Sequence, residues 1–152
     1  MLVSKITDNL FIGKTPKRAD FNYLKNNNIK NIVNMRADYF WFDTNNPQGI
    51  LITWVPTIDF ILLPINAKKL MRTALEMSKK IQSGEKVLCF CRMGRHRSVA
   101  MAAAILITQG YSADDAMHHI KLKRPIADPY ARHIKKTIYQ FENLWIEKKS
   151  LL

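Results

Sequence analysis

Two apolar segments joined by a short basic loop constrain the fold of this chain more than any other feature. Lys86 to Cys91 is a continuous apolar run after a charged edge, a pattern typical of a central buried strand. Residues 98–109 are apolar almost all round, which indicates a buried helix, and Gly110 follows them. Cys91 would then end the most apolar strand, and open α/β sheets bind their ligands at the carboxyl ends of their strands.

The rest of the chain alternates between strand and helix patterns. We predict strands at 9–13, 31–35, 50–55 and 86–91, and helices at 20–28, 66–83, 98–109, 113–123 and 129–147. Asn66 and Ser112 are expected to cap helices, and Pro56 is expected to close a strand. This alternation predicts an α/β fold with a central, mostly parallel sheet flanked by helices on both faces.

The chain has the size and composition of one globular domain, which we place at residues 1–152. Hydrophobic residues make up 47% and charged residues 24%, so disorder is not expected. The two cysteines lie inside an apolar run rather than in a disulfide framework, and no secretory signal precedes them. The longest apolar run, 99–107, is too short to span a membrane. We expect a soluble, cytoplasmic monomer without a cofactor or metal.

The net charge of +12 (24 basic minus 12 acidic residues) favours an anionic partner. Lysines and arginines are scattered along the whole chain, without a basic arm or a ladder of aromatic residues for stacking bases. A solvated basic surface explains this charge at least as well as nucleic-acid binding does.

The loop between the buried strand and the buried helix has the groups needed to bind a phosphate. Backbone amides at a turn and at a helix N-terminus point into one concavity, and Gly94 permits a sharp turn. The guanidinium of Arg97 matches two phosphoryl oxygens. The same groups favour a thiolate at Cys91, which makes it a nucleophile beneath a bound phosphate.

A cysteine followed by five residues and an arginine resembles the active-site loop of the protein tyrosine phosphatase superfamily. With Ser98 after the arginine, the loop is similar to that of the compact dual-specificity phosphatases. The resemblance extends along nearly the whole chain, through residues 9–13, 32–36 and 113–125.

This resemblance implies a catalytic set of Cys91, Arg97, Asp59 and Ser98. Cys91 would be the nucleophile and Arg97 the phosphate clamp. Asp59 lies 91 − 59 = 32 residues before the cysteine, where that family has its general acid. Without the resemblance, Asp59 would be interpreted as a turn residue between two prolines. Asp38 and Asp43 are the alternative acids. Ser98 would assist departure of the thiolate, or simply cap the helix.

The phosphate-binding positions of the loop are Arg92, Met93, Gly94, Arg95, His96 and Arg97. Arg92 and Arg95 resemble basic residues of tensin-related phosphoinositide phosphatases, and residues 94–97 resemble a loop of phosphatases that act on inositol pyrophosphates. By this resemblance the two arginines would contact additional phosphates. The alternative is that they point to solvent or pair with nearby acids.

Two residues near the nucleophile depart from the family pattern. The residue before the cysteine is usually a histidine that orders the loop, and here it is Phe90. Cys89 occupies a usually aliphatic position, and we interpret it as a small buried hydrophobe.

Three histidines outside the loop lie on predicted helices without acidic or cysteine ligands at metal spacing, so surface or packing roles are expected for His118, His119 and His133.

The sequence therefore predicts a cysteine-dependent phosphatase that forms a phosphocysteine intermediate on phosphotyrosine, phosphoserine or phosphothreonine proteins. Alternatives with the same loop are a phosphoinositide or inositol polyphosphate phosphatase, an RNA 5′-phosphatase and a weakly active phosphate-binding module. A rhodanese-like sulfur carrier also has a cysteine loop after a buried strand, but such loops are usually one residue shorter.

Overall fold

The computed structural model describes residues 3–39 and 49–152, which fold around a five-stranded sheet. The strands are β1 (Val3–Lys5), β2 (Leu10–Lys14), β3 (Ile29–Arg36), β4 (Leu51–Thr57) and β5 (Lys86–Cys91). Their order in the sheet is β1-β2-β5-β3-β4, so β5 is central. β2, β5, β3 and β4 run parallel, and β1 pairs antiparallel with β2 at one edge. The predicted mostly parallel sheet is therefore confirmed.

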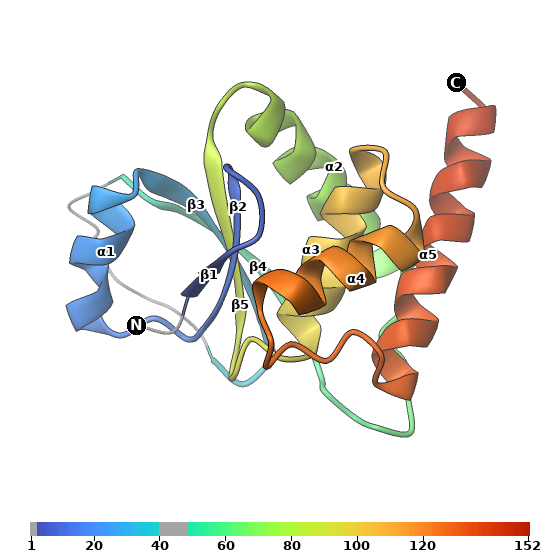
Figure 1. Ribbon diagram of the computed structural model, residues 1–152, viewed down its shortest axis with the longest axis horizontal. Coiled ribbons are helices and arrows are strands. Elements are labelled where there is room, and N and C mark those ends of the chain that lie inside the picture. The colour runs from blue at the N-terminus through green and yellow to red at the C-terminus, as the bar shows by residue number, and fades with distance from the viewer. Residues whose placement is uncertain (1–2, 40–48) are drawn as a thin grey trace.

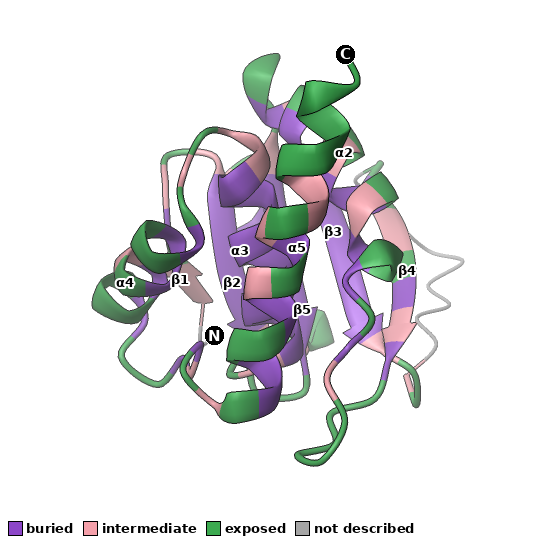
Figure 2. Ribbon diagram, turned by 90° about the vertical axis from the view of Figure 1, so that its right-hand side faces the viewer, coloured by how far each residue is buried: buried purple, intermediate pink, exposed green. Residues whose placement is uncertain are grey.

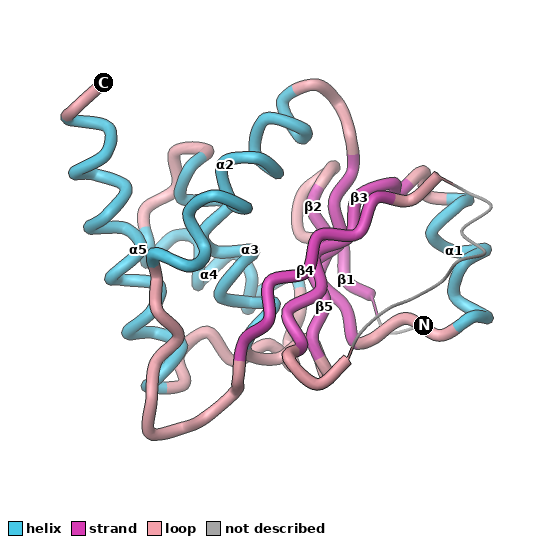
Figure 3. Tube along the Cα trace, turned by 180° about the vertical axis from the view of Figure 1, so that it is seen from behind, coloured by secondary structure: helices cyan, strands magenta, loops and turns pink. Residues whose placement is uncertain are grey.

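Helices cover both faces of the sheet, as predicted (Figure 1). A short 3-10 turn, η1 (Arg18–Asp20), and α1 (Phe21–Asn26) lie on one side. The helices on the other side are α2 (Lys68–Gln82), α3 (Arg97–Thr108), α4 (Ala113–Lys123) and α5 (Arg132–Ser150). Figure 3 shows the same two groups from behind, with the sheet between them.

The central strand β5 divides its side chains between two apolar cores because successive residues of a strand point to opposite faces. Val87, Cys89 and Cys91 join the large core beneath α2 to α5, whereas Leu88 and Phe90 join the smaller core beneath α1. Every residue of α3 from Arg97 to Ile107 is buried, which explains why this helix is apolar all round. Figure 2 shows this buried centre.

Local capping follows the predicted pattern at two helices. The Ser112 hydroxyl accepts a hydrogen bond from the Asp115 N–H (3.0 Å) at the start of α4. The Asn66 side chain accepts one from the Lys68 N–H (3.0 Å) at the start of α2, although Ala67 is the capping position itself. α4 ends at Lys123, with Arg124 as its C-cap before Pro125, which confirms the predicted helix at 113–123.

Two predictions of element ends are clearly wrong, those at Pro56 and at the start of α5, and the strand β1 is not predicted at all. Pro56 lies inside β4 rather than closing it, which is possible because β4 is an edge strand, where a missing N–H need not break the ladder. The three residues of β1 were too few for a period-2 pattern to be recognised. α5 begins at Arg132, three residues after the predicted start.

Most of the predicted aromatic loop, residues 40–48, lies outside the described residues, and Asp43 lies there too. Within residues 3–39 and 49–152, none of the helices combines the length and apolarity that a membrane span requires.

Candidate active site

The candidate site lies where β5 ends and α3 begins. The two elements are joined by residues 92–96, and α3 starts at Arg97, with His96 as its capping residue. Cys91 is 3% exposed at the base of the loop. The Thr15 hydroxyl donates to the Cys91 carbonyl (3.0 Å), and Arg36 donates to the Thr15 hydroxyl (3.0 Å). Neighbouring strand ends thus fix the position of the nucleophile's backbone.

The surroundings of the Cys91 thiol favour its ionised form. Burial raises the pKa of this thiol. Three kinds of group lower it by more than burial raises it: the Ser98 hydroxyl, the backbone N–H groups of Ser98 and Arg95, and the charge of Arg97. The net result is a pKa below the ordinary value of a cysteine. Cys91 Sγ lies 3.1 Å from Ser98 Oγ, so the hydroxyl can donate directly to a thiolate.

Arg97 is buried beside the thiol, and its guanidinium is only partly paired with protein groups. Its Nη1 donates to the Thr57 carbonyl at the end of β4 (3.0 Å). Its buried Nε has no hydrogen-bond partner in the part of the chain that the structure describes. A buried guanidinium N–H without a partner is costly, and a phosphoryl oxygen would satisfy it.

Gly94 allows the loop to pack against both β2 and the end of α4. Its φ of +65° lies in the left-handed region, and a Cβ there would lie 2.7 Å from the Gly13 carbonyl and from Arg124 Nη2. Arg124 is 2% exposed, and it donates from Nε to the Gly94 carbonyl (2.8 Å) and from Nη2 to the Met93 carbonyl (3.1 Å). Its Nη1 donates to the Ser4 hydroxyl (2.9 Å). Arg124 therefore holds the loop in place from 30 residues downstream.

Asp59 lies on the loop after β4 and binds two histidines. Its Oδ2 accepts from His96 Nδ1 (2.8 Å) and its Oδ1 accepts from His133 Nε2 (2.7 Å). Burial raises the pKa of the Asp59 carboxyl, but the hydrogen bonds and charges of both histidines outweigh it and leave the pKa below its usual value. The expectation that His133 has only a surface or packing role is wrong, because the fold brings it to Asp59, which lies 74 positions away in the sequence.

The same three side chains could hold a metal ion. One ligand atom from each of Asp59, His96 and His133 lies within 4.8 Å of the others. His96 and His133 each donate a hydrogen bond to one oxygen of the Asp59 carboxylate, so the two histidines also hold this carboxylate in a fixed position.

Asp38 is unsuited to proton donation even though it lines the same cavity. Arg36 binds it through two hydrogen bonds, Nε to Oδ1 (3.0 Å) and Nη2 to Oδ2 (2.9 Å). This hydrogen-bonded pairing lowers the pKa of Asp38 to about 2. Asp59 is therefore the better acid candidate of these two carboxylates.

The predicted site residues meet in one open cavity of about 470 Å³. Its lining includes Asp59, Cys91, Arg92, Met93, Arg95, His96 and Arg97. Arg92 is exposed at the cavity, whereas Arg95 lies 3.8 Å from the Asp128 carboxylate. Gly94 and Ser98 are buried and do not line the cavity, and Gly94 contributes the backbone conformation of the loop.

Two expectations about neighbouring residues have clear outcomes. Ser98 does not cap α3, because the helix already begins at Arg97 and the Ser98 hydroxyl faces the thiol. Cys89 is fully buried with a free thiol whose pKa burial raises, which confirms its interpretation as a small core residue. Phe90 lies on the opposite face of the sheet from the nucleophile, within the smaller core.

The comparisons with known proteins agree with this geometry. The family model of the dual specificity phosphatase catalytic domain matches residues 10–144. An inferred tyrosine phosphatase, 123R, of Invertebrate iridescent virus 6 is 30% identical over 94% of this chain and 93% of its own length. Dual specificity protein phosphatase 1 of Arabidopsis thaliana is 26% identical over 88% of this chain and 66% of its own length.

The fold has a close structural counterpart as well. The crystal structure of PTPMT1 in complex with PI(5)P superposes with a TM-score of 0.84 at 19% identity, over 98% of this chain and 99% of that one. Fold and sequence together define a cysteine-dependent phosphatase. The chain belongs to the dual-specificity phosphatases of the protein tyrosine phosphatase superfamily.

Proposed function

We propose that this chain is a single phosphatase domain that hydrolyses phosphotyrosine, phosphoserine and phosphothreonine in proteins through a phosphocysteine at Cys91. One observation carries the proposal: a thiol of lowered pKa, a buried and partly unpaired guanidinium and an aspartate line one cavity. The relatives named as tyrosine and dual specificity protein phosphatases support the protein substrates.

In the first step, the Cys91 thiolate attacks phosphorus and the bond from phosphorus to the leaving oxygen breaks. Loop amides and Arg97 bind the phosphoryl oxygens as their negative charge shifts. Asp59 donates a proton to the leaving oxygen, so that the substrate side chain departs as a neutral alcohol or phenol rather than as an alkoxide or phenolate.

In the second step, water attacks the phosphocysteine and the sulfur–phosphorus bond breaks. Asp59, now a carboxylate, accepts a proton from the water. The thiolate leaves with the Ser98 hydroxyl 3.1 Å away to donate a hydrogen bond to it. Phosphate is released and the enzyme returns to its starting state.

The ionised state of Asp59 fits this cycle if substrate binding changes its proton affinity. Without substrate, both histidines donate to the carboxylate and lower its pKa. A phosphate dianion bound in the same cavity adds negative charge, and like charges raise the pKa of a carboxyl. The bound substrate thus favours the protonated acid that the first step requires.

Substitution of the nucleophile tests the intermediate. Cys91→Ser should abolish turnover and still bind vanadate, because the loop amides and Arg97 remain. Arg97→Lys should also lose most activity, since an ammonium cannot replace the planar fork. Substantial hydrolysis by the serine variant would exclude the phosphocysteine mechanism.

The acid is tested with two leaving groups. Asp59→Asn should lower kcat by about 10²–10⁴-fold on phosphoserine peptides, whose alkoxide needs a proton. An activated aryl phosphate needs none, and the loss should shrink there. Equal losses on both substrates would assign Asp59 to a structural role.

A phosphoinositide is the second candidate substrate, because two arginines besides Arg97 line the cavity. Arg92→Ala combined with Arg95→Ala should raise KM for a phosphoinositide and leave an aryl phosphate unaffected. The preference is decided by a panel of phosphopeptides, phosphoinositides, inositol polyphosphates and triphosphorylated RNA. If phosphopeptides are hydrolysed faster than every other compound in the panel, a phosphoinositide is excluded as the preferred substrate.

The two free cysteines fit a reducing compartment, and we expect a cytoplasmic monomer.

A further inference from the structure

The loop between β4 and α2 presents an apolar tip to solvent. Phe60 and Leu63 pair across a tight turn, with the Leu63 N–H donating to the Phe60 carbonyl (3.0 Å). The two residues at the tip, Ile61 and Leu62, are 71% and 80% exposed, and Leu63 is 65% exposed. Figure 2 shows this exposed loop projecting beyond the body of the molecule, at the end opposite the C-terminus.

This composition is unusual for a turn. Tight turns at protein surfaces are normally built from Gly, Pro, Asn, Asp and Ser, which adopt the required backbone angles and interact with water. Here Ile58 is 73% and Phe60 50% exposed, so five of the six residues from 58 to 63 are large, apolar and exposed. A contiguous apolar surface of this kind marks an interaction site.

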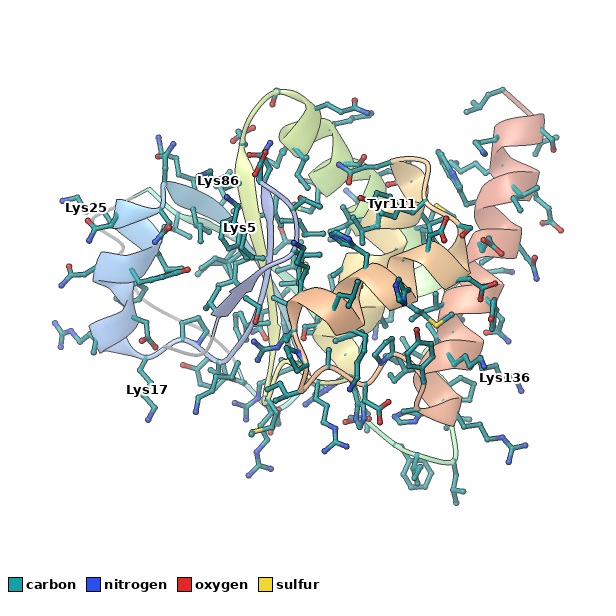
Figure 4. The ribbon with its side chains drawn as sticks, viewed as in Figure 1. Lys5, Lys17, Lys25, Lys86, Tyr111 and Lys136 are labelled. Carbon is teal, nitrogen blue, oxygen red and sulfur yellow. The ribbon has the colours of Figure 1, made fainter. Side chains whose placement is uncertain are left out.

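Basic side chains lie beside the apolar tip. A hollow of about 460 Å³ separates the loop from the first turns of α5, and its lining combines Ile61 and Leu62 with Arg132 and Lys136. Figure 4 shows Lys136 on the same side of the molecule as the loop, whereas Lys25 on α1 and Lys17 near that helix lie at the opposite end. Arg92 is exposed at the active-site cavity, which Ile58 also lines.

We propose that the loop of residues 58–63 inserts its apolar tip into an anionic membrane surface, with Arg132 and Lys136 contacting lipid phosphates. Apolar residues that enter the interface and flanking cations that bind anionic headgroups are the two terms that hold a protein at a lipid surface. The basic rim favours a bilayer over an apolar protein groove, because a protein partner would need a matching acidic border. The active-site cavity, which shares this loop, then opens at the membrane surface.

Vesicle binding tests the proposal, with Cys91→Ser as the parent protein so that the result does not depend on the proposed reaction. The parent should partition onto phosphatidylcholine–phosphatidylserine vesicles more strongly than onto phosphatidylcholine vesicles. Replacing both tip residues, Ile61→Ser with Leu62→Ser, should weaken binding at least about tenfold. Replacing both cations, Arg132→Ala with Lys136→Ala, should weaken it about tenfold or more, on anionic vesicles alone.

Matched controls distinguish the loop from general hydrophobicity and charge. Leu151→Ser with Leu152→Ser removes two more exposed apolar residues, at the far end of α5. Lys17→Ala with Lys25→Ala removes two cations at the α1 end of the molecule. Both controls should bind within about twofold of the parent. All variants change exposed side chains, so unchanged thermal melting verifies that each is folded.

A spin label reports insertion directly. Leu62→Cys in the Cys91→Ser parent provides one accessible thiol, because Cys89 is fully buried. The label should become accessible to oxygen and shielded from a water-soluble quencher when anionic vesicles are added, whereas a label at Leu151→Cys should stay in water. A water-exposed label at position 62, equal binding to neutral and anionic vesicles, or equal losses in the controls would each overturn the proposal. Self-association of the parent that the tip substitutions abolish would overturn it too, and would assign the tip to a protein interface.

Discussion

Gly94→Ala is the substitution whose effect can be worked out most fully from the structure. The residue has a φ of +65°, and a Cβ at this position would lie 2.7 Å from the Gly13 backbone. A left-handed alanine costs about 1–2 kcal/mol. Carbon atoms in contact normally lie about 3.5–4.0 Å apart, so the loop must shift by roughly 1 Å. Overpacking of this kind costs about 1–3 kcal/mol, which gives a total of about 2–5 kcal/mol.

Two measurements follow from that total. For a domain of this size, each kcal/mol lowers Tm by about 2–4 °C, so the melting temperature should fall by roughly 4–20 °C. The shift also moves the Arg95 N–H, one of the groups that lower the pKa of Cys91. The pH midpoint of Cys91 alkylation by iodoacetamide should therefore rise.

Gly84 is the matched control for this prediction. Its φ is +90°, and a Cβ there would have no neighbour within 4 Å. Gly84→Ala should cost only the backbone strain and leave Cys91 alkylation unchanged. Gly94→Asn separates the two terms, since asparagine tolerates the left-handed region but has the same Cβ. A wild-type Tm and alkylation profile for Gly94→Ala would refute the reasoning.

Three further substitutions test the surroundings of the nucleophile. Ser98→Ala should move the midpoint of Cys91 alkylation to higher pH, because the hydroxyl is a major group lowering that pKa; an unchanged midpoint would show that the loop amides suffice. His133→Phe removes one of the two donors to Asp59, so the pKa of this carboxyl should rise and its titration in kcat–pH profiles should move to higher pH. If His133 has only a structural role, the variant should have a lower Tm and an unchanged pH profile. Phe90→His should lower the free energy of unfolding, measured by urea titration, by about 2–4 kcal/mol, because it places a polar ring in a fully buried apolar cluster. The family pattern predicts that the same variant has a lower pKa of the Cys91 thiol. An unchanged thiol pKa would show that other contacts order the loop.

The central strand, the loop and the buried helix could be predicted because each has a local signature. Lys86–Cys91 is an apolar run, and residues 98–107 are apolar on every side, so no distant information is needed. The end of β4 could not be predicted for the opposite reason. A proline is tolerated inside a strand only at the edge of a sheet, and the edge position of β4 is a property of the whole sheet.

The partners of the site residues could not be predicted, because they come from distant parts of the chain. His133 meets Asp59 across 74 positions, and nothing near either residue indicates the pairing. Arg124 lies just after α4, and nothing near it in the sequence indicates that its side chain reaches the Gly94 carbonyl. Ser98 was open to two interpretations, and only the start of α3 at Arg97 decides between them.

The three hydrogen bonds of Arg124 connect the catalytic loop to parts of the chain that are distant in sequence. They join the first strand, through Ser4, to a loop at residues 93 and 94, across a separation of 120 positions at the longest. The Asp128 N–H adds a bond to the Arg95 carbonyl (2.9 Å) from still further along the chain. Closing such long loops is entropically costly and comes late, after local helices and neighbouring strands have formed. A chain that ends before residue 124 would lack the Arg124 and Asp128 bonds to the catalytic loop, and we expect it to be inactive.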